Sequence, residues 1–327
     1  MSKMRVYVVT VISTFAGCGG SSLGYKMAGF TEVLAIDWDN HSEKVFTANF
    51  PDVPFWNKDI TKVSSQDILE ATGLKKGELD VLDGSPPCQG FSTSGKRNVT
   101  DDRNDLFKHF SRLVEGLQPK VFVMENVSGM VKGSMKGKFI EILKDLKSLN
   151  YNVKVKLLNA ANYSVPQSRP RLFFIGVRKD LNKEPVFPKP HGKIITVREA
   201  FKGLEITEEE KIEADIKRFA IYKWWKLLKP GESARKYHPK RSLFNLIKIH
   251  RAKPSGTICK IGGGGSASMV HDKEPRSLVK KELLRLCSFP DNFKIPGKLP
   301  QVYARLGNAV MPKQMEAIAN TIREEIL

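Results

Sequence analysis

The sequence predicts an α/β fold: a doubly wound, mostly parallel β-sheet, followed by a second, smaller and basic domain. Over roughly the first 180 residues, short β-branched runs alternate with amphipathic helical patterns, as in sheets that carry helices on both faces. Beyond about Asn182 the alternation stops, and prolines and then basic residues dominate. Ligands of doubly wound sheets bind at the carboxyl ends of the strands, so we expect the functional residues in the loops at that edge.

The individual elements follow from local periodicity. Residues 5–13 are a β-branched run that predicts the first strand; glycines end it, and a helix continues to Met27. Similar short apolar runs predict strands at residues 32–37, 79–83, 121–124, 153–158 and 172–177. Apolar residues at helical spacing, or an acidic run after a capping threonine, predict helices at residues 40–50, 105–117, 136–149, 207–215 and 312–326.

Composition sets the expected domain limits. Residues 1–181 form the first domain, which a C-terminal segment, about 302–327, completes; residues 182–273 form the basic domain, and residues 274–301 a return segment. The apolar stretch from Val6 to Ile12 is too short to span a bilayer, and no export signal is recognisable. We therefore expect a cytoplasmic protein.

The distribution of charge is as informative as its size. The chain has 54 Lys and Arg against 35 Asp and Glu, a net charge of +19. Between residues 217 and 260 thirteen Lys and Arg accompany one acid, Glu232, which gives +12 in that segment. Aromatic residues lie among these charges, including Trp224, Trp225 and Phe244. An ordinary solvated surface is the alternative, but this concentration favours a nucleic acid as the partner.

Cys88 follows a predicted strand, in the segment Gly84-Ser85-Pro86-Pro87-Cys88-Gln89. Two prolines stiffen the loop and hold the thiol on a rigid, non-helical arm, which suits a reactive cysteine as well as an ordinary loop cysteine. The other cysteines are Cys18, Cys259 and Cys287, and no pair has zinc-ligand spacing. We expect reduced thiols and no metal site.

A glycine-rich turn, Phe15-Ala16-Gly17-Cys18-Gly19-Gly20, joins the first strand to the first helix. Glycines at this junction let the backbone approach a nucleotide closely. Asp37 ends the second strand near the spacing of a ribose-binding acid, Trp38 offers a flat face for adenine, and Asp59 with Ile60 fits the adenine amino group. These residues predict an adenosine cofactor, either a nicotinamide dinucleotide or S-adenosylmethionine.

Five motifs in a fixed order are more specific than any single feature. They are Phe15-Ala16-Gly17-Cys18-Gly19-Gly20, Pro86-Pro87-Cys88-Gln89, Met124-Glu125-Asn126-Val127, Gln167-Ser168-Arg169-Pro170-Arg171 and Leu306-Gly307-Asn308-Ala309-Val310. With this set the chain resembles the DNA (cytosine-5)-methyltransferases of restriction–modification systems, over nearly its full length.

The resemblance implies a sheet of the S-adenosylmethionine-dependent methyltransferase type, with target recognition in residues 182–273. It implies S-adenosylmethionine as cofactor, without a metal, in a site where Asp37 holds the ribose and Trp38 packs on the adenine. Ser13 stands where many members of the family have Asp. The residues that the resemblance assigns to the cofactor are Phe15, Gly17, Gly19, Asp37, Trp38, Asp59, Ile60, Leu106 and Asn308.

The resemblance also assigns the catalytic residues. Carbon 5 of cytosine is a weak nucleophile, which a thiolate activates by adding at carbon 6. Cys88 is implied as that thiol, and Glu125 as the group that stabilises charge at ring nitrogen 3. Arg171 would lie beside the base, and Arg169 would organise the acid. Without the resemblance, Glu125 reads as a capping or ion-paired acid and the two arginines as surface residues of an edge strand.

The expected partner is double-stranded DNA, from which the target base is flipped into the pocket. The residues expected to contact DNA follow Cys88 or lie in the basic domain; they are Gln89, Ser92, Ser94, Lys96, Arg97, Arg235, Arg241, Arg251 and Thr257. A tRNA cytosine-5 methyltransferase is the alternative activity. A non-catalytic DNA-binding module and a nicotinamide oxidoreductase are the readings from other classes. We expect a monomeric, DNA-associated prokaryotic protein that works beside a cognate restriction endonuclease.

Overall fold

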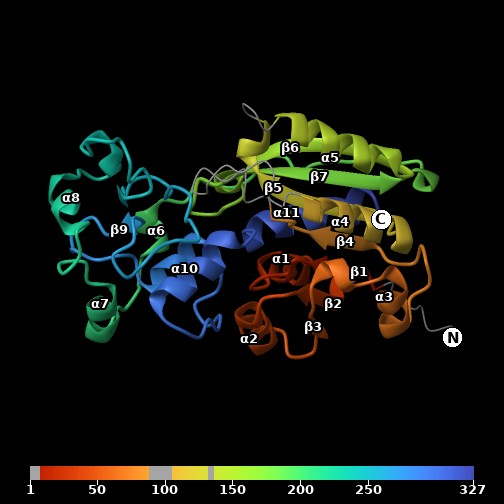
Figure 1. The fold of residues 1–327 in the computed structure, drawn as a ribbon, viewed down its shortest axis with the longest axis horizontal. Helices are drawn as coiled ribbons and strands as arrows, with labels where there is room; N and C mark the ends of the chain where they lie inside the picture. The colour runs from red at the N-terminus through yellow and green to blue at the C-terminus, as the bar shows by residue number, and fades with distance from the viewer. Residues whose placement is uncertain (1–7, 88–104, 132–135) are drawn as a thin grey trace. The chain divides into compact units, whose positions relative to one another are not determined.

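The computed structural model describes residues 8–87, 105–131 and 136–327. The chain divides into two compact units, whose helices and strands are drawn in Figure 1. Unit 1 takes its residues from Met1–Leu158, Pro170–Lys189 and Met315–Leu327, and unit 2 from Asn159–Arg169 and Pro190–Gln314. Among the described residues no helix is both long and apolar enough to cross a bilayer.

The sheet of unit 1 has the strand order β3-β2-β1-β4-β5-β7-β6 among the described residues. The strands are β1 Thr10–Thr14, β2 Thr31–Asp37, β3 Phe55–Asn57, β4 Val81–Gly84, β5 Val121–Val127, β6 Tyr151–Asn159 and β7 Pro170–Arg178. The pairings β1–β2, β1–β4, β2–β3 and β4–β5 are parallel, whereas β5–β7 is antiparallel. The mostly parallel sheet predicted from the alternating pattern is therefore confirmed.

Helices flank this sheet, as the apolar periodicity predicted. They are α1 Gly20–Met27, α2 Asn40–Asn49, α3 Ser65–Thr72, α4 Leu106–Leu117, α5 Lys136–Ser148 and α11 Pro312–Glu325. One hydrophobic cluster joins Phe110 of α4, Ile68 of α3 and Ile142 of α5 to Ile12 and Phe122 of the sheet. Burying side chains of this size contributes about 1.5–3 kcal/mol each, so this face of the sheet is a principal source of stability.

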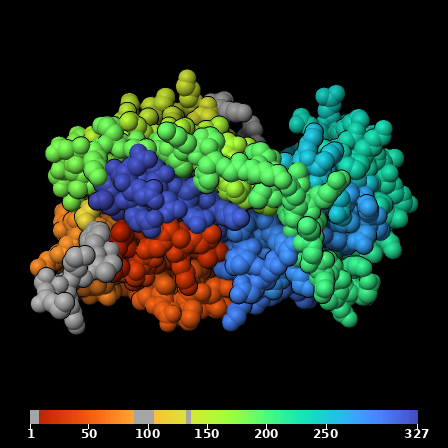
Figure 2. All heavy atoms as spheres, turned by 180° about the vertical axis from the view of Figure 1, so that it is seen from behind, coloured from red at the N-terminus to blue at the C-terminus, as the bar shows by residue number. Residues whose placement is uncertain are grey.

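The C-terminal helix α11 lies against the first helix. Arg323 of α11 donates a hydrogen bond from Nη1 to the carbonyl of Ala28, which ends α1. Figure 2 shows this helix in dark blue beside the red N-terminal residues. Ile318 and Ile322 of α11 are fully buried, as their helical spacing predicted, so the last residues of the chain belong to the core of unit 1.

Several elements of unit 1 differ from the prediction: β1 begins only at Thr10, β3 was not predicted, and two further differences have a clear cause. β5 runs three residues beyond Met124, because its antiparallel pairing with β7 continues through Glu125 and Asn126 to Val127. The helix α3 was not predicted, although Ser64 and Asp67 form the capping box that marks its start. In both cases a short or polar segment gains its regular structure from neighbouring strands or from a local cap.

Unit 2 contains short elements around a small apolar core. They are α6 Val197–Ala200, α7 Glu208–Ala214, α8 Tyr222–Leu227, α9 Lys280–Leu286, α10 Leu299–Asn308 and the parallel pair β8 Ile247–Lys248 and β9 Met269–Val270. The core includes Ile216, Leu246 and Val270, and Trp224 and Trp225 pack against it. These two aromatic residues of the basic segment are partly buried and therefore contribute to the core of unit 2 as well as to its surface.

Candidate active site

The turn between β1 and α1 is shaped by backbone that only certain residues adopt easily. Phe15 and Gly17 have φ of +55° and +56°, and Gly19, which caps α1, has φ of +82°. A Cβ on Gly19 would lie 2.5 Å from the ring of Phe50. A glycine is required there both for the left-handed backbone and for the close approach of α2.

Asp37 at the end of β2 holds this turn in place. Its Oδ2 accepts a hydrogen bond from the backbone N–H of Gly17 at 2.8 Å, and its Oδ1 accepts one from Asp39 at 2.9 Å. The backbone N–H of Lys58 donates to the Asp37 carbonyl at 3.1 Å, which brings the segment after β3 to the same edge. The carboxyl ends of β1, β2 and β3 therefore meet where the sequence predicted a nucleoside site.

The other cofactor residues predicted in unit 1 lie at this edge. Of the residues that the structure describes, a Cβ built on Gly17 would meet only Phe15, at its carbonyl oxygen 3.9 Å away, so among these residues the turn is open on that side. Trp38 is 73 % exposed beside it. Asp59 caps a short 3-10 helix, and the hydrogen bond that it accepts from the Thr61 N–H lowers the pKa of its carboxyl. The neighbouring Ile60 is buried in the core.

These features fit an adenosine group. An exposed indole, an apolar floor and an ionised carboxylate beside an open glycine turn are what its ring and hydroxyls require. Of the two remaining cofactor residues, Leu106 begins α4 and packs partly against the core of unit 1. Asn308 belongs to unit 2, where it is the last, exposed residue of α10.

The segment that leads to Cys88 is anchored on β5. Asn126 donates from Nδ2 to the carbonyl of Pro86 at 3.2 Å, a buried contact. Asn126 was quoted in a motif but was assigned no role, and this contact gives it one. Cys88 itself lies outside the described residues, as do the predicted DNA contacts Gln89, Ser92, Ser94, Lys96 and Arg97.

Glu125 and Arg171 form an ion pair on two adjacent antiparallel strands. Arg171 Nε lies 2.9 Å from Glu125 Oε1, and both side chains are mostly buried. The register of β5 and β7 places Glu125 opposite Phe173 and Val127 opposite Arg171, so the pair is diagonal across the two strands. A carboxylate at this depth keeps a fixed orientation because the guanidinium compensates its charge.

Arg169, two residues earlier, lies in unit 2 and is held differently. It is buried, and its guanidinium donates to the carbonyls of Ile258 at 3.1 Å and Gly307 at 2.9 Å. The sequence assigned the organisation of the acid to Arg169, and the ion pair with Glu125 described above is made by Arg171. The contacts of Arg169 instead tie together the backbone around Ile258 and the Leu306-Gly307-Asn308 motif.

A second buried acid, Asp83 on β4, was missed by the sequence reasoning. Asp83 lies opposite Ser13 in the β1–β4 register, and Tyr25 donates to its Oδ1 at 3.3 Å. Burial, which outweighs its hydrogen bonds, raises the pKa of Asp83 to about 8. Its register partner, Ser13, is the position at which the family resemblance leads one to expect an acid. A polar residue inside the apolar run 81–84 was the available signal.

The family is decided by comparison with known proteins. The family described as C-5 cytosine-specific DNA methylase matches residues 9–324. The chain belongs to this family. It is therefore a DNA (cytosine-5)-methyltransferase, as the five motifs predicted.

Relatives of this methyltransferase cover almost its entire length. The type II methyltransferase M1.HphI of Haemophilus parahaemolyticus is 38% identical over 98% of the chain and 89% of its own. M.DdeI of Desulfomicrobium norvegicum is 31% identical over 96% and 88%. A prophage-encoded E. coli protein described as a DNA modification methyltransferase has a TM-score of 0.78 at 26% identity, over 97% of this chain and 99% of its own.

The DNA contacts predicted in unit 2 of the methyltransferase fall into two kinds. Arg235 and Arg241 are exposed, and Arg241 has φ of +47°. Arg251 is instead bound to both carboxylate oxygens of Asp272, at 3.0 and 2.9 Å. The hydroxyl of Thr257 donates to the Ser168 carbonyl at 3.0 Å. Arg235 and Arg241 are therefore the more available of the four for contacts with bases.

Proposed function

We propose that this methyltransferase transfers a methyl group from S-adenosylmethionine to carbon 5 of one cytosine in a specific double-stranded DNA sequence, through a covalent Cys88 adduct on a flipped-out base. The observation that carries the proposal is the buried Glu125–Arg171 pair on β5 and β7. Glu125 of this pair lies on β5, next to Asn126, whose side chain binds the carbonyl of Pro86, two residues before Cys88. Addition to cytosine needs a thiol and an oriented carboxyl, and the anchored Pro86 precedes Cys88 by two residues in the sequence.

The reaction follows from the weakness of carbon 5 as a nucleophile. The Cys88 thiolate adds to carbon 6, and the electron pair of the 5,6 double bond becomes available at carbon 5. Negative charge spreads to ring nitrogen 3, to which Glu125, once it has taken a proton from solvent, donates that proton or a strong hydrogen bond. After the methyl group has bonded to carbon 5, water removes the carbon 5 proton and the thiolate leaves carbon 6. The products are 5-methylcytosine and S-adenosylhomocysteine, the thioether that remains when the sulfonium has lost its methyl group.

Arg171 is a positioning residue in this scheme. Because its Nε binds Glu125 Oε1 at 2.9 Å, the second carboxylate oxygen keeps a fixed direction for the base. Cys287 is unsuited to the nucleophilic role, because burial raises the pKa of its thiol to about 11. The target base has to leave the helix for Cys88 to reach carbon 6, so base flipping is part of the proposal.

The cofactor would be held at the edge of β1, β2 and β3. Asp37 would bind the ribose hydroxyls, Trp38 would cover the adenine, and Asp59 with Ile60 would read its edge. The open side of Gly17 fits a close approach of the nucleoside. S-adenosylmethionine supplies the methyl group as an electrophilic sulfonium. Gly19, Phe15, Leu106 and Asn308 complete the proposed set.

The biological setting is also a proposal. Relatives named type II methyltransferases suggest a modification enzyme that works beside a restriction endonuclease of the same specificity. The net charge of +19 suits a monomer that associates with DNA in a prokaryotic cytoplasm. Exposed basic residues of unit 2, Arg235 and Arg241 first among them, would recognise the DNA target sequence.

Covalent trapping tests this mechanism. A duplex carrying 5-fluorocytosine at the target position should give a denaturant-stable adduct in the presence of S-adenosylmethionine, because fluorine cannot leave carbon 5 as a proton does. Peptide mapping should locate the adduct on Cys88, and Cys88→Ser should form none while still binding duplex DNA. A labelled tRNA pool is the comparison substrate. Methyl transfer to tRNA but not to any duplex would overturn the choice of substrate, and an adduct on another residue would overturn the role of Cys88.

A further inference from the structure

A groove of about 540 Å³ lies on unit 2, where four segments of the chain meet. Arg198 belongs to α6, Pro230 follows α8, and the other lining residues come from the turns after β8 and β9. The lining residues are Arg198, Pro230, His250, Arg251, Ala252, Asp272 and Lys273. Arg198 and Lys273 lie outside the segment 217–260 that carries most of the excess charge. Only the fold brings them to the same groove.

Backbone hydrogen bonds fix the segments that line the groove. The N–H of Arg198 donates to the Arg251 carbonyl at 2.9 Å, and that of Val197 to the Lys253 carbonyl at 2.9 Å. The N–H of Ile249 donates to the Val270 carbonyl at 3.0 Å, which holds the turn after β8 beside the turn after β9. A lining fixed in this way binds a ligand without the cost of ordering loops.

The groove carries a surplus of positive charge. Asp272 is the one acid among the described residues that line it. Burial alone would raise the pKa of the Asp272 carboxyl, but the hydrogen bonds and charge of Arg251 outweigh burial and lower that pKa. Asp272 therefore stays ionised and neutralises Arg251. Arg198 and Lys273 make no ion pair within the part of the chain that the structure describes, so their charges remain for a ligand. His250 accepts the Ala252 N–H at Nδ1, at 3.2 Å, which leaves Nε2 as a hydrogen-bond donor.

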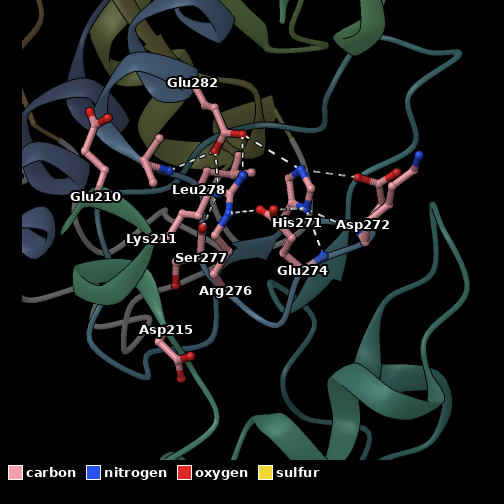
Figure 3. Close-up of polar contacts among 12 residues, drawn as sticks. Glu210, Lys211, Asp215, His271, Asp272, Glu274, Arg276, Ser277, Leu278 and Glu282 are labelled. Carbon is pink, nitrogen blue, oxygen red and sulfur yellow. Dashed lines mark hydrogen bonds and ion pairs between the residues drawn. The ribbon is translucent and has the colours of Figure 1, made fainter. Parts of the chain in front are cut away.

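A buried polar cluster supports the wall that carries Asp272 and Lys273. Figure 3 shows Asp272, Glu274, Arg276 and Glu282 gathered around the ring of His271. His271 Nδ1 accepts the backbone N–H of Lys273 at 3.3 Å and of Glu274 at 3.0 Å. Burial first, and then the charge of Arg276, lower the pKa of His271, so the ring is neutral and can accept these bonds. The cluster thus fixes the turn from which Lys273 projects.

We propose that this groove is a binding site for a backbone phosphate of nucleic acid, held by Arg198, Lys273 and His250. A guanidinium, an ammonium and an imidazole N–H around one concave surface match the tetrahedral oxygens of a phosphodiester. The site would fix the register of unit 2 on the duplex without reading bases. The choice of nucleic acid as the ligand rests on the proposed function. Arg251, which is bound to Asp272, then has a structural role in the groove in place of the base contact expected from the sequence.

The salt dependence of DNA binding tests the proposal. Arg198→Ala with Lys273→Ala should weaken binding of a mixed-sequence duplex about tenfold or more near physiological salt, and should lower the slope of log K against log salt concentration by about 0.9 per lost phosphate contact. Lys75→Ala with Lys76→Ala removes the same charge from exposed positions of unit 1 and is the matched control. A slope that falls no more than in the control would overturn the proposal.

Two further measurements distinguish a double variant that does not fold from a groove that binds a free anion and not DNA. Lys273→Glu, a single reversal of an exposed charge, replaces the double variant if the latter does not fold, and it should reduce duplex binding by at least the same factor. Titration with inorganic phosphate distinguishes a free anion from a nucleic-acid strand: phosphate binding in the groove with an unchanged DNA slope would overturn the nucleic-acid assignment. Groove variants without an effect on DNA binding would leave the proposed function standing, because covalent trapping on Cys88 tests that function in the wild-type protein.

Discussion

Glu125 shows how a charged residue comes to lie inside a strand. Its side chain is mostly buried, and an isolated carboxylate there would be costly. The cost is offset by Arg171, which β7 presents beside it at 2.9 Å. The antiparallel register of β5 and β7 places the two side chains together, so a substitution of one leaves the other without this partner. Removing Arg171 alone would leave a buried charge, which costs about 3–5 kcal/mol in comparable pairs.

The buried carboxyl of Asp83 leads to a prediction about how the stability of the fold depends on pH. Burial raises its pKa from 3.8 to about 8 and that of Glu32 from 4.5 to about 7, so both groups hold more protons in the folded chain than in the unfolded one. Stability should therefore be highest below about pH 4 as far as these groups decide it, and should fall as pH rises through 7 and 8. Each pKa unit corresponds to about 1.4 kcal/mol, so the effect is on the order of a few kcal/mol.

Thermal unfolding from pH 5 to pH 9 measures this effect. Asp83→Asn keeps the shape of the side chain and its contact with Tyr25 but cannot ionise, so its melting temperature should decline less steeply with pH than that of the wild type. Asp52→Asn, at an exposed carboxyl, is the control and should leave the pH profile unchanged. A wild-type profile as flat as that of Asp83→Asn would contradict the assignment of a buried, proton-holding acid.

At the scale of elements, Gly19 decides how α1 begins. A side chain there meets the ring of Phe50 at 2.5 Å in addition to the left-handed backbone. Gly73 has a similar φ, +68°, but no atom of the described part of the chain lies within 4 Å of an added Cβ. Gly73→Ala should thus cost only backbone strain, about 1 kcal/mol, whereas Gly19→Ala should cost roughly 2–4 kcal/mol, because overpacking adds to it.

The two alanine variants are compared by denaturant unfolding and by S-adenosylmethionine affinity. Gly19→Ala should lower both, because the displaced start of α1 carries the glycine turn with it. Gly73→Ala should lower stability slightly and leave cofactor affinity unchanged. Equal losses of stability in the two variants would show that contact with Phe50 does not constrain the turn.

The elements that were predicted are those whose pattern is local. Short β-branched or apolar runs mark β1 and β2, and helical spacing marks α4 and α11, because in each the buried residues are close together in the sequence. The polar end of β5 was missed, since Glu125 and Asn126 become strand residues only by pairing with β7. Asp83 was likewise missed: the sequence shows a polar residue in the apolar run 81–84, but its burial depends on pairing with the neighbouring strands β1 and β5.

In the molecule as a whole, the basic segment 217–260 is not a self-contained module. Its apolar residues Leu228, Ala234 and Leu246 share a core with Ile216 and Val270, which lie outside the segment. The indole N–H of Trp225 donates to the His271 carbonyl at 2.8 Å. Arg251 is bound to Asp272. Exchange of residues 217–260 alone would therefore break the core, whereas residues 182–273 contain all of these contacts.

Exchange of residues 182–273 for the aligned region of M1.HphI is the test of where DNA recognition lies. Base-edge contacts determine sequence, and phosphate contacts do not. If this region carries the base-reading residues, the chimera should keep methyl transfer and should modify the site of M1.HphI, determined in parallel, in place of the original one. Bisulfite sequencing of DNA from cells that express each protein reads both sites at once. A folded, active chimera that still methylates the original site would contradict the assignment, because the determinants would then lie in the residues that were retained.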